Sequence, residues 1–396
     1  MKKLGLLPKI ILAIVIGVLI GSVFPEWVIK GFATFSGIFG NFLGFAIPLI
    51  IIGFIAPGIG ELGKGAGKLL GATTAVAYAS TIIAGVIAYY VSTILFPNIL
   101  KVGQLADNFD NPEEALTSAY FTVDMPPIMG VMTALLLAFT IGLGAAVIKG
   151  ETLQKGMIDF RDIVEKMISA IIIPLLPFHI LSVFANLTYG GQVKMILSVF
   201  VKVFVIIIAL HLLYLIFQYT VAGQISRKNP FRLIKNMVPA YFTAIGTQSS
   251  AATIPVTVRQ TKKNKVNEKI TDFVIPLCAT IHLSGSTITL VCCSMAVMML
   301  NGMETSFSIL FPFILMLGIT MVAAPGVPGG AVMAAIGLLE TMLGFDQTLL
   351  SLMIALYLAQ DSFGTATNVT GDGAIAIIID KLNPSKNKKK QQHLAS

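Results

Sequence analysis

The residues best suited to chemistry in this sequence form a polar block at positions 361–373. The block reads Asp-Ser-Phe-Gly-Thr-Ala-Thr-Asn-Val-Thr-Gly-Asp-Gly and has apolar sequence on both sides. On a helix, the spacing of four of its polar residues places them on one stripe. Ionisable groups in apolar, membrane-like sequence are costly and by default mark a path for a substrate or an ion. The block therefore predicts a binding site inside a membrane, formed by Asp361, Thr365, Asn368 and Asp372.

Each polar group on this stripe suits a different partner. The carboxylate of Asp361 suits a substrate ammonium group, and the amide of Asn368 can donate to and accept from a substrate carboxylate. Asp372 offers hard oxygens to a monovalent cation. The alternative is a polar seam between helices, held by hydrogen bonds of about 1 kcal/mol. Two carboxylates disfavour the seam, because an unpaired buried charge costs several kcal/mol.

Two further segments have small or polar residues at the centre of an apolar stretch. One is Gly-Thr-Gln-Ser-Ser-Ala-Ala-Thr at 246–253, where Ser249 and Ser250 offer hydroxyls and backbone N–H groups. Such N–H groups favour an anion when they lie at a helix terminus. The other is Ala-Ala-Pro-Gly-Val-Pro-Gly-Gly at 323–330. Each segment is expected to be the tip of a hairpin.

The composition predicts that these segments lie in a membrane. The chain has 396 residues, of which 56% are hydrophobic and 12% charged, and its mean hydropathy is +0.87. Soluble domains carry about twice that share of charge. Apolar stretches at 10–24, 69–96, 131–148 and 195–217 approach the roughly 20 residues that span a bilayer. We therefore expect an all-α polytopic membrane protein, whose first apolar stretch is a retained helix because it lacks a small-residue cleavage site.

The elements that must position the site follow from the apolar pattern. The polar tip at 246–253 lies between basic loops, so its hairpin at 231–261 is expected to enter and leave on one side. A helix at 272–300 follows, broken at His-Leu-Ser-Gly-Ser, 282–286. The pattern then repeats as a hairpin at 307–341 and a helix interrupted by the 361–373 block. Two hairpin and broken-helix units in opposite orientations form the inverted repeat of secondary transporters. Six helices are expected before them, at 8–25, 32–60, 66–97, 126–149, 152–187 (interrupted at Pro174 and Pro177) and 191–222, giving eight helices and two re-entrant hairpins.

Charge distribution predicts the orientation. The net charge is +8, and the basic residues cluster in short loops and in the tail at 381–390, as in cytoplasmic segments. The loop at 101–124 has one lysine and five acidic residues and is expected outside. Both termini are then cytoplasmic, and the protein lies in the cytoplasmic (inner) cell membrane. The basic residues are thus explained by the bilayer, without a nucleic-acid partner.

Other functional classes fit less well. An intramembrane aspartyl protease needs opposed carboxylates, but Asp361 and Asp372 would lie roughly 16 Å apart along one helix. A hydrolase using Ser284 and His282 lacks a separate helix to supply the base. A channel would suit the hairpins, but a single mixed-charge site suits occlusion better than permeation. Transport remains the favoured class.

Four motifs in order resemble the glutamate transporter family of dicarboxylate/amino-acid:cation symporters. They are Asn-Val-Thr-Gly-Asp at 368–372, the serine-rich tip at 247–253, Gly-Val-Pro-Gly at 326–329 and Ala-Thr-Ile at 279–281. The resemblance is strong over 231–382. It implies a homotrimer that moves its cargo by an elevator mechanism, with the second hairpin as the outer gate. The static scaffold would comprise 1–65 and 126–187, the moving transport domain 66–97 and 191–382, and the cytoplasmic tail 383–396.

The resemblance also implies the roles of individual residues. The substrate would be lined by Ser250, Ser286, Val327, Asp361, Thr365 and Asn368, with Ser249 in the same tip. One sodium ion would be bound by Asp372 with the backbone of Asn368 and Cys278. A second would be bound by the backbone of Thr280 and of the segment from Val322 to Ala324.

Departures from the family pattern affect both coupling and specificity. His282 replaces an asparagine that helps to hold sodium, and Ser284 replaces an aspartate linked to a further sodium ion. We therefore expect fewer coupled sodium ions; proton coupling through His282 and a packed neutral His282 are both left open. Gln248 and Gly364 stand where acidic-substrate members carry an arginine. Without that charged fork, the sequence favours a small neutral amino acid, with a dicarboxylate as the alternative.

Overall fold

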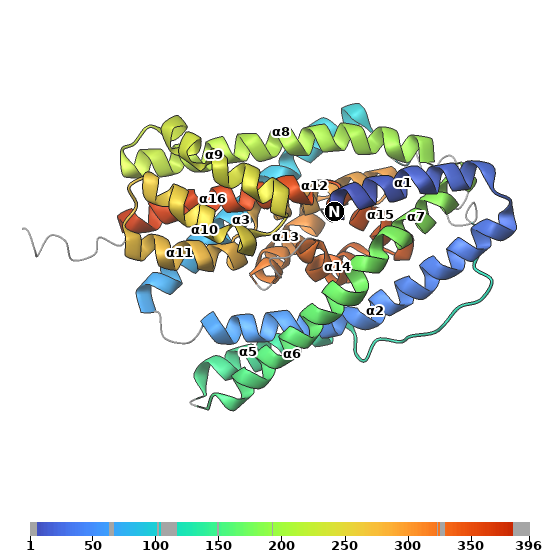
Figure 1. The fold of residues 1–396 in the computed structure, drawn as a ribbon, viewed down its shortest axis with the longest axis horizontal. Coiled ribbons are helices and arrows are strands. Elements are labelled where there is room, and N and C mark those ends of the chain that lie inside the picture. Colours follow the sequence, from blue (N-terminus) through green and yellow to red (C-terminus); the bar gives the residue numbers. More distant parts are fainter. Residues whose placement is uncertain are drawn as a thin grey trace, which may run out of the picture.

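The computed structural model describes residues 6–62, 67–100, 103, 117–148, 150–191, 193–322, 324 and 329–382. Val327, most of the acidic loop at 101–124 and the tail at 383–396 lie outside these residues. The regular structure of the described residues is entirely helical (Figure 1). This confirms the all-α class. Within the described part, five helical stretches are long and apolar enough to span a membrane, and one bent pair adds a sixth. The full set of eight helices and two re-entrant hairpins remains a prediction.

The first half of the chain forms long helices close to their predicted bounds. The predicted fifth helix is continuous, but it contains a π-helical segment, η1, immediately before Pro174. A proline ring inside an α-helix clashes with the carbonyl group four residues earlier, and a wider turn relieves that clash. The prolines therefore widen the helix without ending it. The elements are α1 (Leu6–Val23), α2 (Glu26–Leu62), α3 (Gly67–Ile99), α5 (Val131–Val147), α6 (Thr152–Met167), η1 (Ile168–Ile172), α7 (Ile173–Tyr189) and α8 (Val193–Ser226).

The second half consists of shorter helices in pairs. Two pairs correspond to the predicted hairpin arms, and two correspond to the predicted broken helices. In order they are α9 (Pro230–Thr247) and α10 (Ser250–Lys263), α11 (Glu268–Ile281) and α12 (Ser284–Leu300), α13 (Phe307–Met321) and α14 (Gly330–Leu343), and α15 (Gln347–Leu358) and α16 (Asp361–Leu382).

The position of one break differs from the prediction. The block at 361–373 does not interrupt the last helix, because it forms the first half of α16. The break lies just before it, at Ala359 and Gln360, where α15 and α16 meet at a bend of 58°. An aspartate in the first turn of a helix is favourable, so Asp361 suits the start of α16. The other break is also shorter than 282–286 and comprises only His282 and Leu283.

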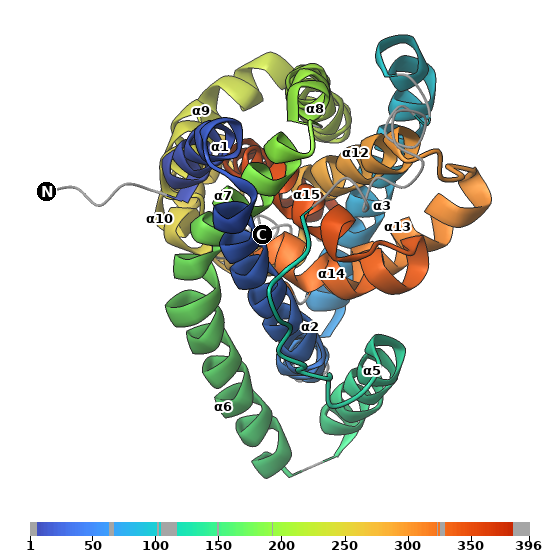
Figure 2. The same cartoon turned by 90° about the vertical axis from the view of Figure 1, so that its right-hand side faces the viewer.

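The helices pack as two sets (Figures 1 and 2). In the first, which we call the α2 set, α1 packs along α7 while α2 contacts α5, α6 and α7. In the second, the α12 set, α12 is surrounded by α3, α8, α15 and α16, and α9, α10 and α11 pack on α16. Contacts between the sets are sparser and involve mainly α14 and α15. Every residue of α12 is buried, so α12 is the centre of its set.

Candidate functional site

The polar stripe of α16 faces the break between α11 and α12. All four of its residues are buried in the protein, with 1–6% of their surface exposed. The predicted stripe is thus confirmed as one face of a helix, and none of its polar groups opens directly to the surface. Buried polar groups must find hydrogen-bond partners, and these partners come from the first turn of α12, from His282 in the break before it, from Gly329 at the start of α14 and from Tyr357 of α15.

Asn368 bonds directly to the beginning of α12. Its side-chain oxygen accepts hydrogen bonds from the backbone N–H groups of Gly285 (2.7 Å) and Ser286 (3.3 Å). The N-cap residue of α12 is Leu283, whose side chain cannot accept such bonds. Asn368 therefore caps α12 from a different helix. Its amide nitrogen also donates to the Ser286 hydroxyl at 3.0 Å, which brings two predicted substrate residues together.

Asp361 connects α16 to the second hairpin. One carboxylate oxygen accepts a hydrogen bond of 2.7 Å from the backbone N–H of Gly329, the N-cap of α14. Gly329 has a φ of 74°, which a residue with a side chain adopts only with strain. Thr365 lies one turn along α16 and interacts with the same carboxylate. The hairpin contact thus reaches the residue predicted to bind the substrate ammonium group.

The first hairpin has the predicted tip. Helix α9 ends at Gln248 in the left-handed conformation (φ 53°), and Ser249 caps α10 by accepting from the backbone N–H of Ala252 at 3.2 Å. Ser250 is buried, and both arms of the hairpin pack on α16 (Figure 1). The tip therefore lies among the elements of the site, with hydroxyl groups at a helix N-terminus.

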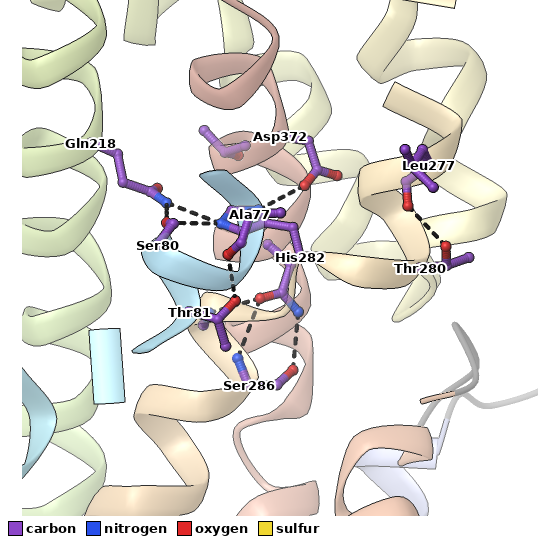
Figure 3. Close-up of polar contacts among 12 residues, drawn as sticks. Ala77, Ser80, Thr81, Gln218, Leu277, Thr280, His282, Ser286 and Asp372 are labelled. Atoms are coloured by element: carbon purple, nitrogen blue, oxygen red, sulfur yellow. Dashed lines mark hydrogen bonds and ion pairs between the residues drawn. The ribbon is translucent and has the colours of Figure 1, made fainter. Parts of the chain in front are cut away.

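His282 connects the predicted cation residue to two other helices (Figure 3). Its Nδ1 lies 2.9 Å from Asp372 Oδ1, while its Nε2 lies 3.1 Å from Ser80 Oγ and 3.3 Å from Gln218 Nε2. An amide nitrogen can only donate, so Nε2 acts as the acceptor and the ring carries its proton on Nδ1. In this arrangement the imidazole Nδ1–H donates to Asp372. One carboxylate oxygen of Asp372 is therefore engaged by the protein itself.

The predicted sodium ligands are only partly brought together. Cys278 lies beside Asp372, but its carbonyl group accepts the backbone N–H of His282 at 2.9 Å. Thr280 is exposed, and its hydroxyl bonds to the Leu277 carbonyl at 2.8 Å, away from the His282–Asp372 pair (Figure 3). Val322 follows α13 and Ala324 is buried, with Ala323 between them outside the described residues. The second ion site stays a prediction.

The described residues contain no cluster of three or more histidine, cysteine, aspartate or glutamate side chains that could hold a metal ion. A transition-metal centre built on such ligands is therefore not supported there. Sodium differs, because it is bound mainly by oxygen atoms, many of them backbone carbonyls.

Sequence reasoning missed a polar face on α8. His211, Tyr214 and Gln218 lie on it, and all three are buried. Gln218 donates to Ser80 Oγ at 3.0 Å, and His211 Nε2 lies 3.0 Å from the Gly285 carbonyl. The signal was present as polar residues spaced three and four apart in an otherwise apolar helix. This face places further hydrogen-bonding side chains beside the break in α11–α12.

Gly364, which stands where acidic-substrate members of the family carry an arginine, lies against the first turn of α12. A Cβ atom built there would meet the Ser286 nitrogen and Thr289 Oγ1 at 3.5 Å, which is ordinary contact. A Cβ on Gly285 would instead overlap the Gly364 carbonyl oxygen and lie 2.7 Å from Thr367 Cβ. The close approach of α12 and α16 therefore depends on Gly285, whereas position 364 has room for a small side chain.

Comparison with known proteins identifies the family of this chain. A family model described as the sodium:dicarboxylate symporter family matches residues 6–382. The chain belongs to this family. The family and the relatives it resembles are transporters, not enzymes. The predicted resemblance is thereby confirmed, and the intramembrane protease is excluded.

Two relatives of this symporter-family chain show different cargo in their names. Excitatory amino acid transporter 1 of Bos taurus is 26% identical over 306 residues, which cover 72% of this chain and 54% of the relative. Neutral amino acid transporter A of Homo sapiens is 32% identical over 189 residues, which cover 48% of this chain and 34% of the relative. The chain thus spans about half, or less, of the length of the curated relatives it matches. The names of these relatives therefore do not identify the substrate of this chain.

Proposed function

We propose that this protein is a cation-coupled symporter that carries a small neutral amino acid into the cell across the cytoplasmic membrane. The observation that carries the proposal is the α16 stripe, on which Asp361, Asn368 and Asp372 lie buried beside a helix break. Membership in a symporter family supports the transport class. Both termini are proposed to be cytoplasmic.

The substrate follows from the charges at the site. Asp361 supplies a negative charge for an ammonium group, and Asn368 with the tip at Ser249 and Ser250 supplies neutral donors for one carboxylate. Among the described residues, no lysine or arginine hydrogen-bonds to the side chains of Asp361, Asn368 or Ser250. A second carboxylate would lack a charge-assisted partner, and burying it unpaired would be costly. A zwitterion with a neutral side chain fits best, while a dicarboxylate is the second candidate, favoured by the family description.

The coupling ion is proposed to be sodium, bound at Asp372. The family description supports sodium, and the carboxylate lies near the carbonyl end of α11. Since His282 already donates to one oxygen of Asp372, the ion would use the other oxygen together with backbone carbonyls. Proton coupling through His282 is the alternative.

The elevator mechanism is proposed on the basis of the packing. The α2 set corresponds to the expected scaffold, and the α12 set to the expected transport domain. Sparse contacts between the sets support a sliding boundary. The homotrimer is proposed from the family resemblance and has the scaffold as its assembling part.

The test is uptake into proteoliposomes under imposed sodium or proton gradients. The labelled substrates are serine, alanine, cystine, aspartate and succinate, with a gradient-free sample as the control. We expect serine or alanine to accumulate only with an inward sodium gradient. Uptake of aspartate or succinate alone would overturn the neutral assignment, and accumulation driven only by protons would reassign the coupling ion.

A further inference from the structure

Four basic residues gather at one end of the α12 set, away from the substrate and ion residues. The turn after α8 contains Arg227 and Lys228, the turn between α10 and α11 contains Lys265, and the last turn of α16 contains Lys381. These three segments lie at the same end of the molecule (Figure 1). We call the four residues the basic cluster. Three of them are exposed, and Lys228 is half-buried.

Hydrogen bonds hold the three segments of the basic cluster together. The Nζ of Lys228 donates to the Asn264 carbonyl at 2.6 Å, which joins the turn after α8 to the turn after α10. The backbone N–H of Asn267 donates to Asp380 Oδ1 at 3.3 Å, which joins that second turn to the end of α16. The backbone positions that carry the four charges are therefore fixed relative to one another by the fold.

The charges of the basic cluster are only partly neutralised by the protein. Partial burial and the positive charges of Lys381 and Lys265 lower the pKa of Lys228, and the carboxylate of Asp380 opposes this shift. In the part of the chain that the structure describes, none of the four basic side chains forms a salt bridge. An anion supplied from outside the protein would relieve the repulsion between these like charges.

Two members of the basic cluster have a backbone conformation that favours glycine. Arg227 directly follows α8 with a φ of 55°, and Lys265 lies two residues beyond α10 with a φ of 57°. Helices often end with a glycine in this left-handed conformation, because a residue with a side chain adopts it with strain. A positive charge at a helix C-terminus offsets part of that strain. The chain thus has basic side chains at two helix ends where glycine would avoid the strain.

We propose that the basic cluster binds the phosphate headgroups of anionic phospholipids in the cytoplasmic leaflet. Clusters of about four to eight lysines and arginines directly beyond a membrane helix are attracted to such headgroups. The apolar span Ile196–Ser226 ends immediately before Arg227, so the cluster begins where the apolar span ends. This inference goes beyond the transport function and rests on the proposed orientation, in which this end of the molecule is cytoplasmic. Bound lipid would attach the proposed transport domain to that leaflet.

The experiment titrates the purified full chain in detergent with dioleoyl phosphatidylglycerol, an anionic lipid, or with dioleoyl phosphatidylcholine, which has no net charge. Bound lipid is counted by native mass spectrometry at low ionic strength, where exposed charges are screened least. We expect phosphatidylglycerol to bind about 10-fold more tightly or better. The double variant Arg227→Gly, Lys265→Gly should bind it about 30-fold more weakly, because each charge contributes about 5-fold. The matched control is Lys194→Gln, which removes an exposed charge at the opposite end of α8 and should leave the affinity unchanged.

The glycine substitutions also distinguish lipid binding from a structural role. Glycine relieves the left-handed strain, so the double variant should unfold in phosphatidylcholine at a Tm no lower than that of the wild type. Phosphatidylglycerol should raise the Tm of the wild type but not that of the double variant, since a ligand stabilises the state that binds it. If the two residues served only to stabilise helix ends, the double variant would have a lower Tm and an unchanged lipid affinity. That result would overturn the proposal.

Two further measurements keep the proposal testable. Should the double variant not fold, Lys381→Gln removes an exposed charge of the basic cluster and should weaken phosphatidylglycerol binding about 5-fold. Inorganic phosphate at the concentration of the lipid should not displace phosphatidylglycerol; displacement would make the cluster a site for soluble anions and overturn the lipid assignment. Equal binding of the two lipids would overturn it as well. None of these measurements involves uptake, so the proposed transport function can fail without affecting their outcome.

Discussion

At the scale of single residues, the site depends on side chains that hold one another. Asn368 caps α12, Tyr357 and Asn368 hydrogen-bond to Ser286, and His282 donates to Asp372. The last pair contains the only carboxylate of the site that is predicted to bind an ion. The negative charge of Asp372, rather than the shape of its side chain, should determine the coupling of substrate transport to the ion.

Replacing Asp372 by asparagine tests this point. An asparagine oxygen can still accept the bond from His282 Nδ1, so the packing is preserved while the negative charge is lost. We expect Asp372→Asn to abolish gradient-driven accumulation but to leave exchange of substrate across the membrane. Asp380→Asn is the matched control, since Asp380 lies on the same helix and accepts a hydrogen bond from the Asn267 backbone N–H outside the site. If ion-driven accumulation survives in Asp372→Asn, the assigned cation site is wrong.

Residue identities predicted the stripe but not its partners. The spacing of Asp361, Thr365, Asn368 and Asp372 is local information, so it could be interpreted before the fold was known. The capping bond from Asn368 joins residues more than 80 positions apart in the sequence. The α8 residues and Tyr357 were missed for the same reason, because their importance appears only when distant helices come together.

At the scale of elements, the sequence predicted the wrong position for the break in the last helix, because it placed that break in the polar block at 361–373. The block was expected to interrupt the helix, yet α16 is continuous through it. A Cβ on Gly373 would lie 2.6 Å from the Tyr219 hydroxyl, and one on Gly371 would lie 2.7 Å from Gln218 Oε1. These glycines allow α8 to approach α16 closely. Polarity and glycine content therefore marked helix packing, whereas the bend occurs at Ala359 and Gln360.

The contact of α12 with α16 gives a prediction at this scale. Gly285→Ala should separate the two helices, because its Cβ would overlap the Gly364 carbonyl; such overpacking costs about 1–3 kcal/mol. Gly364→Ala is the matched control and should be close to neutral. Thermal unfolding in detergent can be followed with a thiol-reactive dye, since all three cysteines are buried. We expect a lower Tm only for Gly285→Ala, and equal Tm values would contradict the proposed contact.

At the scale of the whole molecule, a histidine connects the two helix sets. His179 on α7 lies 3.1 Å from Ser36 Oγ on α2 and 3.1 Å from Ser351 Oγ on α15. Ser351 already donates its hydrogen to the Gln347 carbonyl, so His179 Nε2 must be the donor to Ser351. The bond to Ser36 lies within the α2 set, whereas the bond to Ser351 crosses between the sets. A cavity of about 330 Å³, lined in part by Ser36, His179 and Ser351, adjoins this crossing.

The hydrogen bond from His179 to Ser351 can be used to test whether the two helix sets slide past each other or form one rigid body. If α15 moves relative to α7, Ser351→Ala should shift the population of the observed conformation by about 2- to 10-fold, the value of one hydrogen bond. Ser36→Ala removes a bond of the same length within one set and should leave the populations unchanged. Single-molecule energy transfer between dyes on α1 and α13 measures the populations. Equal effects of the two substitutions would argue against a sliding boundary at α15.

The cap that Asn368 provides for α12 restricts how the cargo of this protein can diversify during evolution. Asn368 caps the central helix and is also proposed to bind the substrate, so we expect a substitution at 368 to alter both properties together. Gly285 is similarly constrained, because a side chain there would overlap the Gly364 carbonyl oxygen. A small side chain at position 364 should not disturb the packing of helices, because it fits there without displacing α12. Lineages that adopt new cargo should therefore vary at 364 first, while 285 and 368 drift little.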